Sequence, residues 1–243
     1  MILALTVAFA LMQDDKADLL NAARKVGEAK SYTFRGETRL AMPESLIKDA
    51  GAEPIRFEGR VDRAVGATVK TDLHEFAMAG GRTAVRPTVE WRALKDDNGD
   101  LQRLLYQAIA GARGFRLPHD EFGSWPKALA SVKRTETVEK VGDKDGRVYE
   151  GEFTTESSRE LLHALFPIGK WMDRIPIERP TGTARAWING EGRLLKLELS
   201  AKVAASIQGQ PVQLSATRTT TFSDVDSTKV TISDEAKKVL EPK

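Results

Sequence analysis

The chain has 243 residues, of which 41% are hydrophobic and 30% charged, a balance that suits one large globular domain or two small ones. Lysine and arginine total 37 against 35 acidic residues, and the two signs are interleaved, so the composition does not favour nucleic-acid binding. Cysteine is absent, which excludes disulfides, thiolate metal sites, a cysteine nucleophile and anchoring through a lipid-modified cysteine.

The N-terminal residues indicate the cellular compartment of the protein. Residues Ile2–Met12 are apolar and are followed at once by Gln13-Asp-Asp-Lys16. This stretch is shorter than the roughly 20 residues that span a bilayer, and its length is typical of the apolar region of a secretory signal. Ala8-Phe9-Ala10 fits the small-residue cleavage pattern, although no basic residue precedes the stretch. We expect residues 1–12 to be an uncleaved signal peptide; the alternative is a buried first helix or strand.

Helical spacing of apolar residues predicts a first helix over Asp15–Ala29. Alternating apolar and polar residues then predict strands, because each alternation places one apolar face and one charged face on the chain. The expected strands in the first part of the chain are Ser31–Ala41, Pro54–Val65, Gly66–Phe76 and Arg82–Arg86. Opposite charges on neighbouring strands are expected to pair on the solvent face.

The middle of the chain changes character. The spacing there predicts helices over Leu101–Arg113, Trp125–Val132 and Glu156–Trp171. The expected later strands are Arg134–Val141, Arg147–Thr154, Val212–Phe222 and a long hairpin over Thr183–Val203, and a short terminal helix is expected over Ser233–Leu240. This order does not alternate strand and helix, so it favours an α+β fold with one large antiparallel sheet over a doubly wound fold.

The sequence carries no recognised catalytic or metal-binding motif. None of the three histidines, His74, His119 and His163, sits at metal-ligand spacing, and no G-x-S-x-G motif occurs. His74 is expected to be solvated, and His163 to be partly buried. The segment Pro118-His-Asp-Glu121 is interpreted as a polar loop; an enzyme would require its His119, Asp120 and Glu121 to cluster in a buried cleft. No cofactor or metal is predicted.

Three groups of segments carry a family resemblance. They are Ser31-Tyr-Thr-Phe-Arg-Gly-Glu-Thr-Arg-Leu40 with Phe57-Glu-Gly-Arg-Val61, Gly182-Thr-Ala-Arg-Ala-Trp-Ile188 with Leu194-Leu-Lys-Leu-Glu-Leu199, and Thr219-Thr-Thr-Phe-Ser-Asp-Val225. In element order and hydrophobic pattern the chain resembles the LolA/LppX/LprG-like lipoprotein-carrier superfamily. The resemblance implies a single domain over residues 13–243, a curved antiparallel half-barrel sheet with helices packed on its concave face.

The resemblance further implies an exported, non-enzymatic carrier or sensor that binds a lipid or lipoprotein acyl chain between sheet and helices. It would be periplasmic or extracytoplasmic, soluble and not lipid-anchored, with no membrane span after signal removal. The expected cavity lining is Phe34, Phe57, Val61, Leu73, Leu105, Ile109, Leu162, Phe166, Trp171, Leu195, Leu197 and Leu199. The alternative is an envelope protein-interaction or sensing module with a filled core and no lipid ligand, because lining and core side chains look identical in a sequence.

Overall fold

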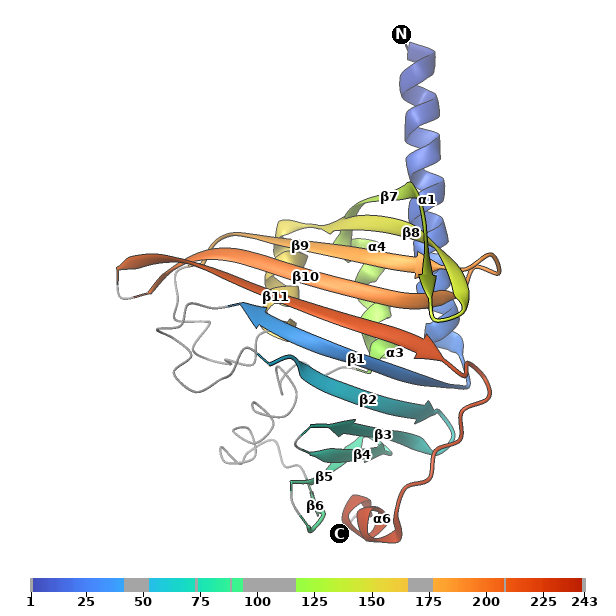
Figure 1. Cartoon of the computed structure of the whole chain (residues 1–243), viewed down its shortest axis with the longest axis vertical. Helices are drawn as coiled ribbons and strands as arrows, with labels where there is room; N and C mark the ends of the chain where they lie inside the picture. The colour runs from blue at the N-terminus through green and yellow to red at the C-terminus, as the bar shows by residue number, and fades with distance from the viewer. Residues whose placement is uncertain are drawn as a thin grey trace.

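The computed structural model describes residues 2–41, 53–72, 74–87, 89–93, 117–165, 177–207 and 209–241, with the backbone alone for residues 2–14 and 207. These residues form one open antiparallel sheet of eleven strands, in the order β6-β5-β4-β3-β2-β1-β11-β10-β9-β8-β7 (Figure 1). The strands are β1 (Ser31–Ala41), β2 (Ile55–Asp62), β3 (Gly66–Thr71), β4 (Glu75–Ala79), β5 (Arg82–Arg86), β6 (Arg92–Ala93), β7 (Leu129–Val141), β8 (Lys144–Phe153), β9 (Ile177–Ile188), β10 (Leu194–Ile207) and β11 (Gln210–Ser223). The predicted single antiparallel sheet is thereby confirmed.

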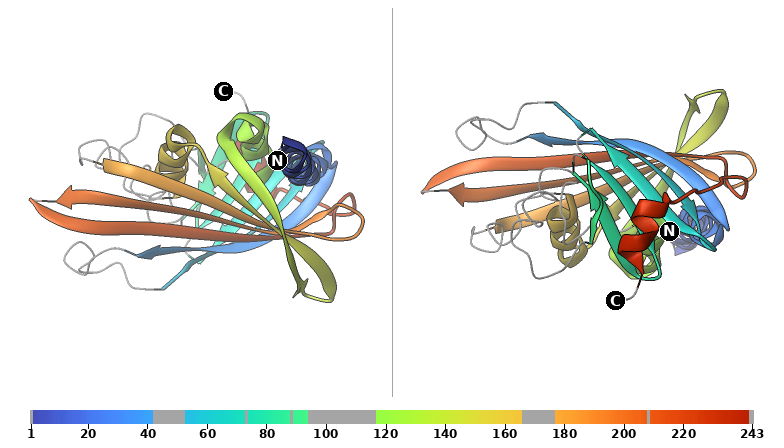
Figure 2. Two further views of the ribbon diagram at one scale, coloured as in Figure 1. Left: turned by 90° about the horizontal axis from the view of Figure 1, so that it is seen from above. Right: turned by 90° about the horizontal axis from the view of Figure 1, so that it is seen from below.

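The helical elements are α1 (Ile2–Glu28), α3 (Pro118–Glu121), the 3₁₀ turn η2 (Phe122–Ser124), α4 (Trp125–Ala128), α5 (Thr155–Leu165) and α6 (Asp234–Leu240). Helices α1, α4 and α5 lie on the same side of the sheet (Figure 2). We call the sheet face toward these helices the core face and the opposite face the outer face.

Helix α1 runs without a break from the apolar N-terminal stretch into the predicted first helix, and its N-terminal part extends beyond the sheet (Figure 1). Its second half is held on the core face by the stripe Leu19, Ala22, Ala23 and Val26, which is fully buried at helical spacing. Polar contacts fix its position: the Tyr149 hydroxyl donates to Asp18 at 3.0 Å, and Lys16 Nζ donates to the Leu129 carbonyl at 2.6 Å.

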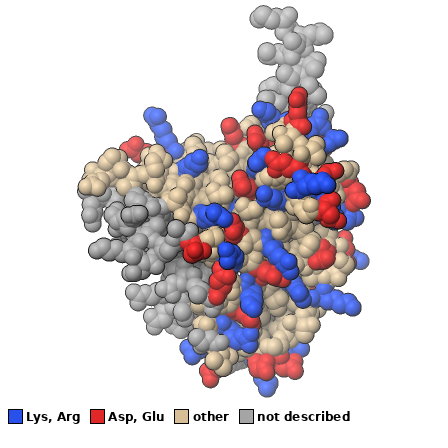
Figure 3. Space-filling view, in the orientation of Figure 1, with Lys and Arg blue, Asp and Glu red and all other residues tan. Residues whose placement is uncertain are grey.

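The outer face carries an alternating row of charges across five strands. Residues directly opposite one another across the strands form the series Arg35, Glu58, Lys70, Glu75 and Arg86. Arg35 pairs with Glu58 at 3.2 Å, and Arg86 pairs with Glu75. Both signs are intermixed over this face (Figure 3), as expected for a solvated sheet surface on which each exposed pair contributes little.

The outer face also carries two small apolar clusters that the sequence pattern did not predict. One lies under α6 and joins Ala77 and Ala84 of the sheet to Val230, Ile232, Ala236 and Leu240. The other joins Val148, Trp187 and Leu195. Helix α6 begins as predicted, because the Ser233 hydroxyl accepts the Ala236 N–H at 3.2 Å and caps its first turn.

Several predicted boundaries are wrong. The expected strand Gly66–Phe76 is two strands, because the chain turns where the Thr71 N–H donates to the His74 carbonyl at 2.8 Å. His74 is consequently buried at 8% exposure and stacks on Phe76, where we expected it to be solvated. The expected helix Trp125–Val132 ends at Ala128, and Leu129 starts β7. The expected helix Leu101–Arg113 lies outside the described residues.

Candidate functional site

A cleft of about 530 Å³ lies between the short helices, α5 and the core face of β10 and β11. Its size falls within the roughly 300–1,000 Å³ typical of small-molecule sites. Its apolar walls are Trp125, Ala128, Phe153, Leu161, Ala164 and Leu199, and its polar lining is Glu121, Ser124, Ser157, Glu160, His163 and Arg218. The lining is therefore half apolar and half polar.

Aromatic packing and one glycine position the walls of the cleft. Trp125 begins α4 with Pro126 in its first turn, and its ring meets Phe153 of β8 edge-on at 6.1 Å. Helix α5 approaches β9 closely at Gly182, where a Cβ would lie 3.0 Å from the Ser158 Oγ and 3.2 Å from Leu161. The small residue therefore sets the distance between α5 and the sheet.

A buried ion pair closes the inner end of the cleft. Arg218 of β11 donates from Nη2 to both carboxylate oxygens of Glu121, at 2.6 and 2.7 Å. The two side chains are only 9% and 15% exposed. Arg218 lies on the core face directly between Leu199 of β10 and Thr38 of β1, so the pair ties α3 to the middle of the sheet.

Behind this pair the described interior is filled. The same two charged residues, with Phe34, Phe57, Pro118, Leu197, Thr220 and Phe222, line a void of only about 10 Å³, which is at most the space of one water molecule. The Phe34 ring covers Gly59 of β2, and the Phe57 ring covers Gly36 of β1. These cross-strand pairs of phenylalanine and glycine let both rings lie flat against the sheet.

The predicted lining residues separate into three groups. Phe34, Phe57, Val61, Leu162, Leu197 and Leu199 are at most 8% exposed and belong to one core between the sheet and the helices. Of these, Leu199 lines the cleft, whereas Phe34, Phe57 and Leu197 line the small void. Leu73, Leu105, Ile109, Phe166 and Trp171 lie outside the described residues.

Leu195 is on the wrong face for a lining residue. The pairing of β10 with β9 shifts by one residue between Leu194 and Lys196, as in a β-bulge. Leu194 joins the main core, while Leu195 packs with Val148 and Trp187 on the outer face. Lys196 lies beside it there, 4.1 Å over the Trp187 ring. The expectation that Leu195 faces the same side as Leu197 and Leu199 is therefore wrong.

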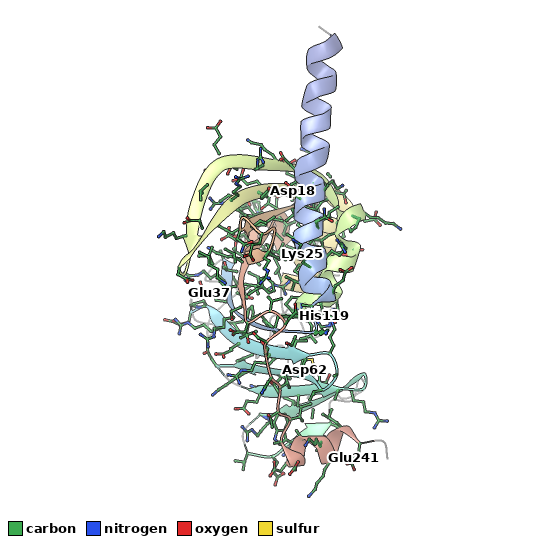
Figure 4. All side chains as sticks on the ribbon, turned by 90° about the vertical axis from the view of Figure 1, so that its right-hand side faces the viewer. Asp18, Lys25, Glu37, Asp62, His119 and Glu241 are labelled. Atoms are coloured by element: carbon green, nitrogen blue, oxygen red, sulfur yellow. The ribbon has the colours of Figure 1, made fainter. Side chains whose placement is uncertain are left out.

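The segment Pro118–Glu121 is a helical turn whose side chains diverge. His119 lies beside the C-terminal end of α1 (Figure 4), and the Tyr32 hydroxyl is 2.6 Å from its Nδ1. Glu121 turns into the cleft toward Arg218, and Asp120 is 56% exposed. The three residues therefore share one turn but not one pocket, unlike the buried cluster that an enzyme was expected to require.

The hydrogen bond between Tyr32 and His119 suits the neutral form of the His119 imidazole. Burial raises the pKa of the Tyr32 hydroxyl, so it keeps its proton, and it can donate that proton to Nδ1 when the imidazole carries its own on Nε2. Burial lowers the pKa of His119, with Arg63 lowering it further and Asp120 opposing both. The neutral imidazole, protonated at Nε2 toward Asp120 at 3.5 Å, is thus the form that holds α3 against β1.

This lowered pKa predicts a pH dependence of stability. Below the ordinary histidine pKa of about 6.5 the unfolded chain binds a proton that the folded chain resists, so the free energy of unfolding falls as the pH drops from about 7.5 to 5.5. His119→Asn keeps an acceptor near the Nδ1 position without titrating there. Urea unfolding across this range should show a shallower dependence for the variant; identical slopes would contradict the prediction.

The sequence missed Arg218, although a signal for it was present. Leu214, Ala216 and Phe222 alternate on one face of β11, and the same alternation places Arg218 among them. A cation on an apolar face indicates a buried acidic partner, but the pattern does not say which carboxylate provides it. Glu121 is almost a hundred residues away and is brought there by tertiary structure alone.

Two further properties concern the described residues only. Within them no group of three or more histidine, aspartate or glutamate side chains is arranged to hold a metal ion. In the same part of the chain, no helix has both the length and the apolar character required to cross a membrane.

Comparison with known proteins assigns no family. No family model matches the chain, and no curated protein matches it. Among solved structures, a DUF1329 family protein from Desulfovibrio piger aligns over 92% of this chain and 95% of its own, with 9% sequence identity and a TM-score of 0.29. At so low a score and identity, the likeness supports no statement about the function of this chain.

Proposed function

We propose that the protein is an exported, non-enzymatic carrier or sensor that binds the acyl chain of a lipid or acylated protein. The cleft of about 530 Å³ between α5, the short helices and the sheet carries this proposal. In the proposed architecture the sheet is a half-barrel of the LolA/LppX/LprG-like type, and the helices cover its concave face. The apolar stretch Ile2–Met12 supports export to the periplasm or another extracytoplasmic compartment.

The walls of the cleft suit a hydrocarbon chain. Trp125, Leu161 and Leu199 line the cleft, so a chain laid among them would exchange water for apolar contacts. Ten methylenes would contribute roughly 8 kcal/mol gross at about 0.8 kcal/mol each. Losses of ligand freedom and side-chain ordering reduce this sum, so we expect dissociation constants on the order of micromolar.

Filling part of the cleft should weaken binding. Ala164→Trp places an indole in it, whereas Arg159→Trp adds the same side chain to an exposed position of the same helix that does not line the cleft. With cis-parinaric acid as a fluorescent probe, we expect micromolar binding by the wild type and by Arg159→Trp. Ala164→Trp should bind at least about tenfold more weakly, which corresponds to losing roughly two buried methylenes.

Native mass spectrometry of the purified protein after exposure to lipid vesicles provides the second test. Bound lipid on the wild type, reduced in Ala164→Trp, would support the proposal. A wild-type protein that binds neither the probe nor any lipid would contradict it.

One observation favours a protein-interaction or envelope-sensing module instead. The interior around Phe34, Phe57 and Leu197 is closed to about 10 Å³, so that part of the core is filled. A stoichiometric protein partner recovered from envelope extracts without bound lipid would favour this second function. Partner capture that is unchanged in Ala164→Trp would separate it from lipid carriage.

A further inference from the structure

We propose that the Glu121–Arg218 ion pair sets the length of the acyl chain that the cleft accepts. This inference rests on the proposed function and adds a specificity determinant to it. The pair lines both the cleft and the small void behind it, so it stands at the boundary between the two spaces. A chain that enters the cleft meets these two charged groups before it reaches the phenylalanine-lined interior.

The geometry makes the pair a firm boundary. Both carboxylate oxygens of Glu121 accept from one guanidinium nitrogen, within 2.7 Å, and neither side chain is more than 15% exposed. Arg218 is further fixed by its register on β11, between Leu199 and Thr38. A hydrocarbon chain in the cleft displaces its water and cannot solvate either charge, so a longer chain would have to separate the two ions without replacing their partners.

The space beyond the pair offers nothing in compensation. The void lined by Phe34, Phe57 and Leu197 measures about 10 Å³, which is less than a methylene group needs. Separation of the pair would therefore have to be accompanied by movement of buried aromatic rings. Added methylenes should gain affinity only until the chain end reaches Glu121 and Arg218.

Glu160 and His163 of α5 add further polar groups to the lining of the cleft, and Glu160 is exposed. In the proposed complex, the chain end of a single-chain amphiphile lies against the ion pair. The ion pair then limits the length of the chain that the cleft accepts.

The test is a chain-length series of saturated monoacylglycerols, competed against cis-parinaric acid. The uncharged head group keeps the comparison free of charge effects. For the wild type we expect affinity to rise with chain length and then level off. Glu121→Ala with Arg218→Met removes both charges, and the shorter side chain at position 121 leaves space for about two methylenes. In this double variant, affinity should continue to rise for about two more methylenes, and the longest chains should bind roughly tenfold more tightly than they bind the wild type.

Two controls keep the test decisive. Glu139→Leu with Arg185→Met removes an ion pair of 2.8 Å elsewhere in the molecule, outside the lining of the cleft, and should leave the chain-length profile unchanged. Leu197→Ala enlarges the void behind Glu121 and Arg218 without removing either charge, so it too should leave the plateau in place. This second variant tests the inference even if the double replacement fails to fold.

The outcomes separate the two proposals. A wild type that binds no member of the series overturns the proposed function. A wild type with a plateau that the double variant retains, or that Leu197→Ala extends, overturns the chain-length inference alone.

Discussion

Glu121→Ala should lower the free energy of unfolding by about 3 kcal/mol, the lower end of the range for breaking a buried ion pair. The substitution leaves the Arg218 guanidinium, at 9% side-chain exposure, without the carboxylate that receives its Nη2 hydrogens at 2.6 and 2.7 Å. The penalty comes mainly from this uncompensated buried cation. The adjacent cleft admits some water, which is why we expect a value near 3 kcal/mol.

Urea unfolding measures this effect, with an exposed ion pair as the control. Arg24 and Glu28 of α1 form an i,i+4 pair at 2.8 Å with about 60% of each side chain exposed. Arg24→Ala should change the free energy of unfolding by less than about 0.5 kcal/mol. The double replacement Glu121→Leu with Arg218→Met should recover most of the loss. Equal effects of Glu121→Ala and Arg24→Ala would show that the buried pair does not hold α3 to the sheet.

The sheet was predictable because its hairpins are local and its outer face is regularly charged. Most strands alternate apolar and polar residues, and the short turns within the hairpins leave their strands few alternatives to antiparallel pairing. The same alternation places Arg35, Glu58, Lys70, Glu75 and Arg86 in one row of opposite signs. One pairing, β1 with β11, joins strands from distant parts of the chain, and the local pattern could not predict it.

The site was less predictable, because it depends on departures from alternation and on tertiary volume. A bulge of one residue moves Leu195 to the outer face, and the hydrophobic pattern around it contains no mark of that bulge. The alternation of β11 places Arg218 on the apolar face, but only the tertiary structure brings Glu121 to it. The same residue types line a cleft of about 530 Å³ and a closed void of about 10 Å³, so composition could not distinguish an open space from a filled one.

Gly59→Ala should destabilise the protein by about 3 kcal/mol, at the upper end of the range for overpacking a core. A Cβ at this position would lie 2.1 Å from the Phe34 ring, which is 1% exposed and packs against Tyr32 and Phe57 at 6.1 Å each. The ring therefore cannot move aside without displacing its aromatic neighbours. Glycine is needed at this position for space, since its backbone is in the ordinary extended region.

The control for this substitution is Gly190→Ala, at a turn where an added Cβ would meet nothing within 4 Å. It should stay within about 0.5 kcal/mol of the wild type in urea unfolding. Phe34→Leu combined with Gly59→Ala removes the clash, so a double-mutant cycle should return a coupling energy of at least about 1 kcal/mol between the two sites. Additive effects would mean that the loss of stability arises from the backbone of β2. The contact between the Phe34 ring and position 59 would then make no contribution to it.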